Sequence, residues 1–406
     1  MKRKFIALIL SLIAMATLLS GCNASAASRA KERIEKIPVA ADNLVLYGDK
    51  YVTIGQTDYF LPSLAKKLIK GRKPDLYQNT TLYGSRAALY TVVYDRNNSK
   101  REEEGCSLAL FRFDYQTRKA ALLYDMKGTF PVQSYDMATP TVLQYFDEEK
   151  GRCVLVQNGV LEILSTQTGE VIFSQQMFGA KDFFHESSSP FARRGADMVC
   201  AFYAETVKYY RYAGDRYEEF SFTDEAFKSL RAGQFGTVDG VLYAQSGDEI
   251  VFAAQIETGT ACDKSEIAAL VAKKEEEDAL LREQGTAFEQ GEVTYHVKKN
   301  EGMIEVTSDT GATFSLDAAY LSEHSPEMRE IQRIYEEEFP DKTLHFGVDF
   351  VVSENRLFIS TDAEIQGFGL VALYTPVLVF ELDFAEDKIY WQGMHGGARL
   401  GGVRFL

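Results

Sequence analysis

The sequence repeats one short unit, in which two stretches of alternating apolar and polar residues flank a brief polar break. Alternation of this kind is typical of strands with one buried face, and a short break between two such strands is typical of a hairpin turn. Thr168-Gly169 and Thr310-Gly311 place a glycine where the turn needs a positive φ. The copies that align best span residues 111–124, 161–174, 209–222, 303–316 and 380–393, and a weaker sixth copy surrounds Thr258-Gly259.

The spacing of the repeat predicts the fold class. A further apolar stretch precedes most copies, and Cys153 and Cys200 occupy matching places in two of these stretches, 47 residues apart. A unit of three or four strands at such a spacing is typical of a β-propeller blade. Six hairpins and three N-terminal strand-like stretches therefore predict an all-β fold, a β-propeller of seven blades, with six or eight blades as alternatives.

The last residues of the chain offer a way to close such a fold. We expect residues 401–406 (GGVRFL) to pair with the N-terminal strands, residues 43–62, in one shared blade. Pairing of this kind removes the strand edges that an open series of sheets exposes. Another all-β fold, such as a sandwich or an irregular solenoid, is the alternative.

Two segments are predicted to be helical insertions, solvated or packed on a blade. Residues 264–283 alternate in charge, and the second helix begins at Ser325-Pro326, a capping serine followed by proline at the first helical position. The apolar residues of the second helix fall on one face. They are Met328, Ile331, Ile334, Tyr335 and Phe339.

The chain begins with three basic residues, an apolar run over residues 5–19, and the sequence Leu19-Ser20-Gly21-Cys22. The run is shorter than the roughly 20 apolar residues that a membrane-spanning helix needs, and it fits an export signal. Its ending resembles the lipobox of bacterial lipoproteins. This resemblance implies that the chain is cut before Cys22 and that the Cys22 thiol carries the lipid.

This resemblance sets the expected domain organisation. Residues 1–21 are the signal peptide, residues 22–40 a lipidated tether, and residues 41–406 the propeller domain. Two or more acyl chains hold a protein stably on a membrane. The expected location is therefore the outer side of a bacterial cell membrane, with the membrane itself as partner through Cys22.

Composition limits the other partners and the role of the cysteines. Removing the three basic residues of the leader takes the formal net charge from −15 to −18, which disfavours nucleic acid as a partner. Four further cysteines, Cys106, Cys153, Cys200 and Cys262, show no zinc or redox spacing. We expect buried free thiols, with disulfides as the alternative, and no metal or other cofactor.

Residues 307–314 (TSDTGATF) resemble the Asp-box of sialidases and related propellers. The resemblance implies that Asp309 and Gly311 stabilise a hairpin turn, and this box is structural in that family. The sialidase catalytic set is not recognisable, so no catalytic residue is assigned. His185 and His395 lie in segments that resemble surface loops, and no histidine pair has the spacing of a metal site.

The expected function is that of a non-catalytic binding or scaffolding lipoprotein, a monomer with an envelope protein or a glycan as partner. The alternative is a propeller hydrolase or lyase acting on extracellular glycans, with carboxylates gathered from several blades. A solute-binding protein is disfavoured, because such proteins alternate strands and helices in two lobes.

Overall fold

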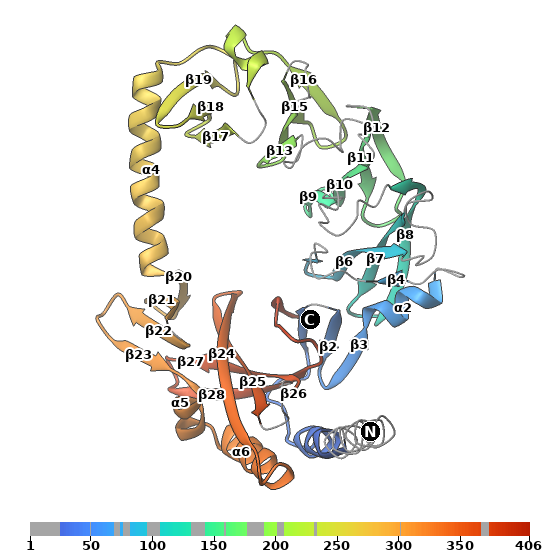
Figure 1. Cartoon of the computed structure of the whole chain (residues 1–406), viewed down its shortest axis with the longest axis vertical. Helices are drawn as coiled ribbons and strands as arrows, with labels where there is room; N and C mark the ends of the chain where they lie inside the picture. Colours follow the sequence, from blue (N-terminus) through green and yellow to red (C-terminus); the bar gives the residue numbers. More distant parts are fainter. Residues whose placement is uncertain are drawn as a thin grey trace, which may run out of the picture. The chain divides into compact units, whose positions relative to one another are not determined.

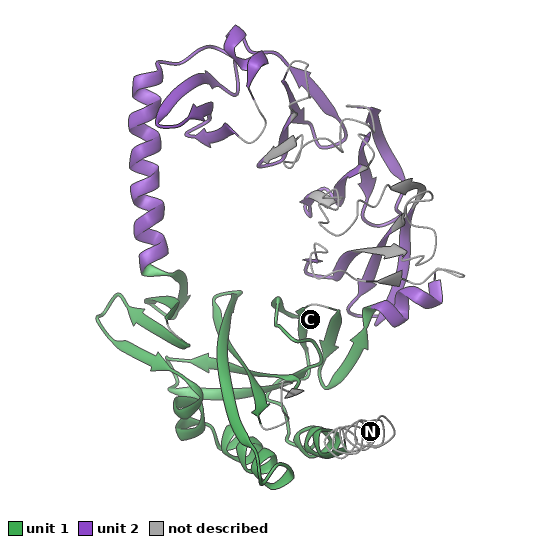
Figure 2. Cartoon of the chain, viewed as in Figure 1, with its two compact units in different colours: residues 1–61, 284–406 green, residues 62–283 purple. Residues whose placement is uncertain are grey.

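In this computed structural model the chain forms two compact units, shown in Figure 2. Unit 1 comprises Met1–Leu61 and Gln284–Leu406, and unit 2 comprises Pro62–Glu283. The structure describes residues 25–48, 50–68, 74–75, 82–95, 106–130, 143–157, 160–176, 191–200, 207–230, 234–300, 302–366 and 373–406. Within those residues, no helix has both the length and the hydropathy that crossing a bilayer requires.

Within the described residues, unit 1 contains three antiparallel sheets, each of four strands with at most one short addition (Figure 1). The first has the order β29 (Gly402–Phe405), β1 (Leu44–Gly48), β2 (Tyr51–Ile54), β3 (Thr57–Phe60). The second consists of β20 (Thr286–Gln290), β21 (Val293–Asn300), β22 (Met303–Ser308) and β23 (Thr313–Leu316). The third consists of β24 (Thr343–Ser353), β25 (Arg356–Gln366), β27 (Val377–Asp383) and β28 (Lys388–His395), with β26 (Leu373–Tyr374) beside β25.

Unit 2 contains four antiparallel sheets within the described residues, three with four main strands and one with three. The first two are β4 (Pro74–Asp75), β5 (Tyr83–Gly84), β6 (Ala88–Asp95), β7 (Cys106–Asp114) and β8 (Lys119–Phe130), then β9 (Leu143–Asp147), β10 (Arg152–Gln157), β11 (Val160–Ser165) and β12 (Val171–Gln176). The others are β13 (Phe191–Arg194), β14 (Asp197–Cys200), β15 (Lys208–Tyr212) and β16 (Tyr217–Phe220), then β17 (Phe235–Val238), β18 (Val241–Ser246) and β19 (Glu249–Gln255).

The strand pairings confirm the predicted fold class. The five best copies of the repeat are the hairpins β7–β8, β11–β12, β15–β16, β22–β23 and β27–β28. The weak sixth copy lies in the three-stranded sheet, where an isolated bridge joins Ala254 to Ala261. The C-terminal strand β29 pairs with β1 as expected. Seven small antiparallel sheets in chain order, the first shared between both ends of the chain, are the organisation of a seven-bladed β-propeller.

Both predicted helices are present, and the described residues contain three further α-helices and one 3-10 helix, η2 (Glu225–Ser229), that were not predicted. α4 spans Lys264–Gln284, and α6 spans Pro326–Glu338 with Ser325 as its N-cap, whose Oγ accepts from the Met328 N–H. The apolar face predicted for α6 is buried. The additional α-helices are residues 25–34, α2 (Leu61–Leu68) and α5 (Ala318–His324). Each is short, so few apolar positions define its period in the sequence.

The cysteines whose side chains are described are free thiols. Cys153 is fully buried in β10, and burial raises the pKa of its thiol to about 12, so it is unreactive at neutral pH. Cys262 is free and half-buried. Cys22 and the side chains of Cys106 and Cys200 lie outside the described part of the chain.

In unit 2, the glycine predicted in the Thr168-Gly169 turn touches the neighbouring sheet. Gly169 has φ +74°, and a Cβ built on it would lie 1.8 Å from the carbonyl oxygen of Leu123 in β8. Gly311 in the Thr310-Gly311 turn has φ +90°, but a Cβ there would meet nothing within 4 Å. Two glycines with the same backbone requirement therefore differ only in what surrounds them.

We expect Gly169→Ala to destabilise the protein much more than Gly311→Ala. Both substitutions carry the cost of a left-handed backbone, about 1–2 kcal/mol, but only Gly169→Ala also forces the β11–β12 turn away from β8. Urea unfolding followed by circular dichroism measures the difference. Equal losses of stability would contradict this close packing of the two sheets.

Candidate functional site

Residues 25–34, the first that the structure describes, are helical and are built into unit 1. Ala26, Ala30 and Ile34, spaced four residues apart, are 5%, 0% and 0% exposed. They belong to one apolar cluster with α6 and the sheets of unit 1. Residues with this spacing lie on one helix face. The folded part of the chain therefore includes residues that the sequence interpretation assigned to the tether.

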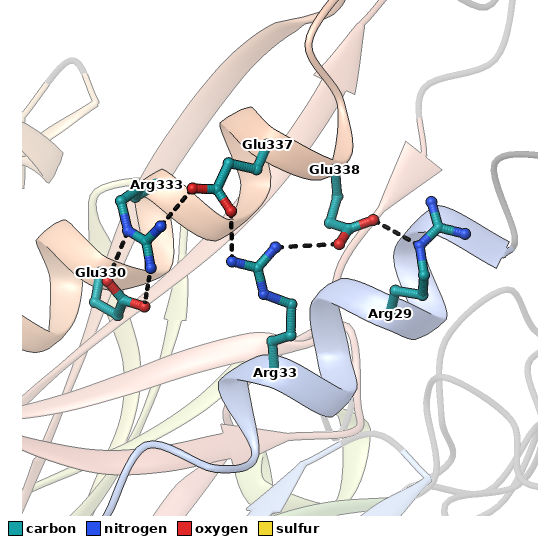
Figure 3. Close-up of polar contacts among 6 residues, drawn as sticks. All are labelled: Arg29, Arg33, Glu330, Arg333, Glu337 and Glu338. Carbon is teal, nitrogen blue, oxygen red and sulfur yellow. Dashed lines mark hydrogen bonds and ion pairs between the residues drawn. The ribbon is translucent and has the colours of Figure 1, made fainter.

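Two arginines on this helix reach the C-terminal end of α6, as Figure 3 shows. Arg29 Nε lies 2.7 Å from Glu338 Oε2. Arg33 bridges two carboxylates, with Nη1 3.1 Å from Glu338 Oε1 and Nη2 2.5 Å from Glu337 Oε2. The Arg29 guanidinium also donates to the Ser25 hydroxyl, which fixes the first turn of the helix. These contacts hold the helix at one place along α6.

A third arginine extends the network along α6. Arg333 Nη2 lies 2.6 Å from Glu330 Oε1, and its Nη1 donates to Glu337. Exposed ion pairs of this kind contribute little to stability, because solvent screens them and the long side chains lose entropy. The Glu338 side chain is the least exposed of the group, at 12%. We conclude that the apolar face holds the helix and that the arginines set its position.

The arginines lower the pKa of their carboxylate partners. For Glu338, burial alone would raise the pKa, but hydrogen bonds from Arg29 and Arg33 outweigh burial and leave the pKa below its ordinary value. The hydrogen bond from Arg33 lowers the pKa of Glu337. The hydrogen bond from Arg333 lowers the pKa of Glu330. All three groups are therefore charged at neutral pH, and the network is complete.

A second polar chain holds the other side of the helix. Lys31 Nζ lies 3.3 Å from Asp58 Oδ2, and the Thr53 hydroxyl donates to Asp58 Oδ1 over 2.7 Å. The Thr53 oxygen also lies 3.0 Å from His395 Nδ1. Because the hydroxyl has a single proton, which Asp58 accepts, the His395 Nδ1 must donate. His395 therefore carries a proton on Nδ1.

His395 was expected in a surface loop, and that expectation is wrong. The residue is the last of β28 and is fully buried, because the strand runs through Gly393 as far as His395 and the glycine-rich segment begins only after it. A Cβ on Gly397 would lie 2.7 Å from His395 Nε2, and one on Gly396 would lie 2.8 Å from Asp58 Oδ2. Glycines at these positions let the backbone pass over the polar chain. His185 lies outside the described residues.

A small pocket, with a volume of about 10 Å³, opens beside the hydrogen-bonded side chains of Lys31 and Asp58. That is room for about one water molecule. Its polar lining comes from Lys31, Glu35, Gln56 and Asp58. No group of three or more histidine, cysteine, aspartate or glutamate side chains able to hold a metal occurs within the described ranges. Lys31 pairs with Glu35 and Asp58, and Gln56 donates to the Ile37 carbonyl, so these polar groups hold the helix and the segment that follows it.

The Asp-box-like turn joins β22 to β23, and its two singled-out residues act on the backbone. Asp309 Oδ2 accepts from the Thr294 N–H at 3.3 Å, and the Asp309 N–H donates to the Thr294 carbonyl at 2.9 Å. Gly311 has φ +90°, and its N–H donates to the Ser308 carbonyl. These bonds tie the turn to the start of β21.

The hairpin of β24 and β25 brings three carboxylates together. The glycan-active alternative also requires grouped carboxylates, but it predicts that they come from several blades. Asp349 on β24 and Asp362 and Glu364 on β25 lie on one face, since Asp362 pairs with Gly347 and Asp349 with Ser360. Burial, together with repulsion from Glu364 and Asp349, raises the pKa of Asp362. Lys299 Nζ lies 3.7 Å from Asp349 Oδ1. The group comes from a single hairpin, whereas the alternative predicts contributions from several blades.

Comparison with known proteins gives no family. No family model matches the chain, and no curated protein matches it. Among solved structures, BamB from Moraxella catarrhalis is 13% identical, with 84% of this chain and 96% of that chain covered and a TM-score of 0.24. The β-propeller domain of the Trilobed protease from Pyrococcus furiosus is 12% identical, with 84% and 92% covered and a TM-score of 0.29.

The N-terminal domain of Nup159 is 8% identical, with 87% of this chain and 77% of that chain covered and a TM-score of 0.25. All three scores are low, so the fold assignment rests on the number, size, order and closure of the sheets themselves. The sequence interpretation missed the helix seat, defined here as residues 25–34 with their contacts on α6 and Asp58. The four-residue spacing of Ala26, Ala30 and Ile34 was the available signal.

Ile34→Ala is expected to loosen the helix seat. Removing a fully buried Ile side chain costs about 2–5 kcal/mol, and Ile34 shares its cluster with Trp391, the single tryptophan of the chain. Urea unfolding followed by Trp391 fluorescence measures the loss. The matched control is Glu32→Ala, an exposed position on the same helix, which should change stability by less than about 0.5 kcal/mol. An unchanged midpoint for Ile34→Ala would mean that the helix adds nothing to unit 1.

The glutamates of α6 that pair with the arginines predict that the stability of the fold depends on pH. The pKa values of Glu330, Glu337 and Glu338 are lower in the folded protein than in the unfolded chain, where they are about 4.5. The charged carboxylates therefore stabilise the folded state above about pH 4.5, and this stabilisation is lost as the pH falls through the lower folded-state pKa values. Urea midpoints from Trp391 fluorescence should fall between pH 5 and pH 3. The double variant Arg29→Gln/Arg33→Gln should fall less steeply, and the same slope in both proteins would show that the network is not coupled to folding.

Proposed function

We propose that the chain is a lipid-anchored extracytoplasmic protein of a bacterial envelope, and that its propeller is a non-catalytic platform for an envelope protein or a glycan. The observation that carries the proposal is the leader ending in Leu19-Ser20-Gly21-Cys22, followed within four residues by the buried Ala26. An export signal next to a lipid-accepting cysteine supports a location on the outer side of the membrane. Because the folded unit includes residues directly after this cysteine, the lipid would anchor the folded unit itself.

The chemistry of the helix seat supports a structural rather than a catalytic role for its polar residues. Asp58 accepts from Thr53 and pairs with Lys31, and His395 donates its Nδ1 proton to Thr53. A general base or nucleophile needs a free lone pair aimed at a substrate. These groups direct their hydrogen bonds at each other and at the helix. The net charge of −18 after removal of the leader favours partners other than nucleic acid.

The proposal predicts that Cys22 carries the lipid. Cells fed an alkyne-bearing fatty acid should label the wild-type protein and the control Cys262→Ala, and Cys22→Ala should lose all label, as read by gel fluorescence and by the mass of the N-terminal peptide. Crosslinking of intact cells should recover an envelope protein or a wall glycan with the wild type and not with Cys22→Ala.

Label that persists on Cys22→Ala would overturn the anchor. A labelled protein that crosslinks to no envelope component would overturn the platform role and leave the anchor in place.

A further inference from the structure

The distance between the lipid site and the folded unit is set by the number of residues between them. Ala26 is 5% exposed and packs in the apolar cluster of unit 1. It follows Cys22 by four residues, and four residues of fully extended chain span at most roughly 14 Å. The acylated cysteine can therefore lie no farther than this from a buried side chain of the propeller.

The bilayer sets the other distance. The hydrocarbon core is about 30 Å thick, and the whole bilayer about 40–45 Å, so each head-group layer is only about 5–8 Å deep. The acyl chains must enter the hydrocarbon, which places Cys22 at the head-group level. Ala26 then lies within the head-group layer or directly above it.

The charges of this face agree with contact with head groups. Residues 25–34 carry three basic side chains and one acidic side chain, in a chain whose net charge is −18 once the leader is removed. The network of Figure 3 pairs three arginines with three glutamates, so it presents no excess of negative charge. With the exposed Glu336 included, residues 25–34 and 330–338 carry four basic and five acidic side chains, so an anionic bilayer repels this nearly balanced face less than it repels the rest of the acidic chain.

We propose that unit 1 rests directly on the membrane through residues 25–29 of the N-terminal helix and the adjoining C-terminal end of α6, with lipid head groups as the partner of this face. The inference rests on the proposed function, since it needs the lipid on Cys22. It replaces the picture of a propeller lifted from the membrane on a tether. Ser28 and Arg29, both exposed on the helix, are the side chains that meet the head groups.

The test uses the full lipidated chain in vesicles of phosphatidylcholine and phosphatidylglycerol that contain a lipid with a nitroxide on its head group. A fluorophore is attached through a noncanonical amino acid in place of Ser28. The control label replaces Asn355, which lies beyond the far end of the 11-residue strand β24, roughly 35 Å along the strand from its start after α6. A second variant carries a flexible linker of about 20 residues between Cys22 and Ser25, which at about 5–6 Å × √n lifts the body by roughly 25 Å.

We expect the label at residue 28 to be quenched several-fold more than the label at residue 355, and the linker variant to lose most of that quenching. Equal quenching of residue 28 with and without the linker would overturn the inference. Flotation with the vesicles separates the two proposals, because a protein that does not float has no working anchor, whereas one that floats with residue 28 unquenched is anchored with another face toward the lipid.

Discussion

The pairing of β29 with β1 is the interaction on which the rest of unit 1 depends. It brings residues 402–405 against residues 44–47, so that the two ends of the chain share one sheet. In this register the two segments approach so closely that only glycine fits at two positions. A Cβ on Gly48 would lie 2.1 Å from the Arg399 carbonyl oxygen, and one on Gly402 would lie 2.3 Å from the Tyr47 hydroxyl. Each side of this pairing would otherwise be an open strand edge. The glycines of the C-terminal segment are therefore there for packing, and not for flexibility.

The pairing of β29 with β1 also positions the residues that contact the N-terminal helix. The helix of residues 25–34 leads into β1, and the segment after β28 leads into β29. Thr53 on β2, Asp58 on β3 and His395 on β28 are hydrogen-bonded in one chain as a result. A buried polar chain of this kind is stable only when its members are satisfied together. The apolar contacts of Ala26, Ala30 and Ile34 and the ion pairs to α6 then hold the helix from its two sides.

The sequence was sufficient for the sheets because their evidence is repeated. Five aligned hairpins and a helix cap at Ser325-Pro326 each pointed to the local structure that formed, and the pairing of residues 401–406 followed from the need to remove edges. The helix seat has no such repetition. The Ala- and Ser-rich residues after Cys22 have the composition of a linker, and two alanines buried by close approach leave almost no apolar signal. His395 was misplaced for a related reason, since its flanking glycines resemble a loop until a crowded backbone neighbour is known.

A folded unit that includes the residues directly after the proposed lipid site has a different consequence from one on a long flexible tether. A tether of n disordered residues lets a body sample distances of about 5–6 Å × √n and all orientations. A chain that is buried from Ala26 onward removes most of that freedom. With the proposed anchor, much of the orientational entropy would be lost once, when the lipid inserts, and a partner in the same membrane would meet the proposed platform in a narrow range of orientations and at a high effective concentration. A partner far from the membrane gains nothing from this arrangement. With the proposed anchor, the packing of the N-terminal helix would thus favour envelope partners that are themselves held at the membrane surface.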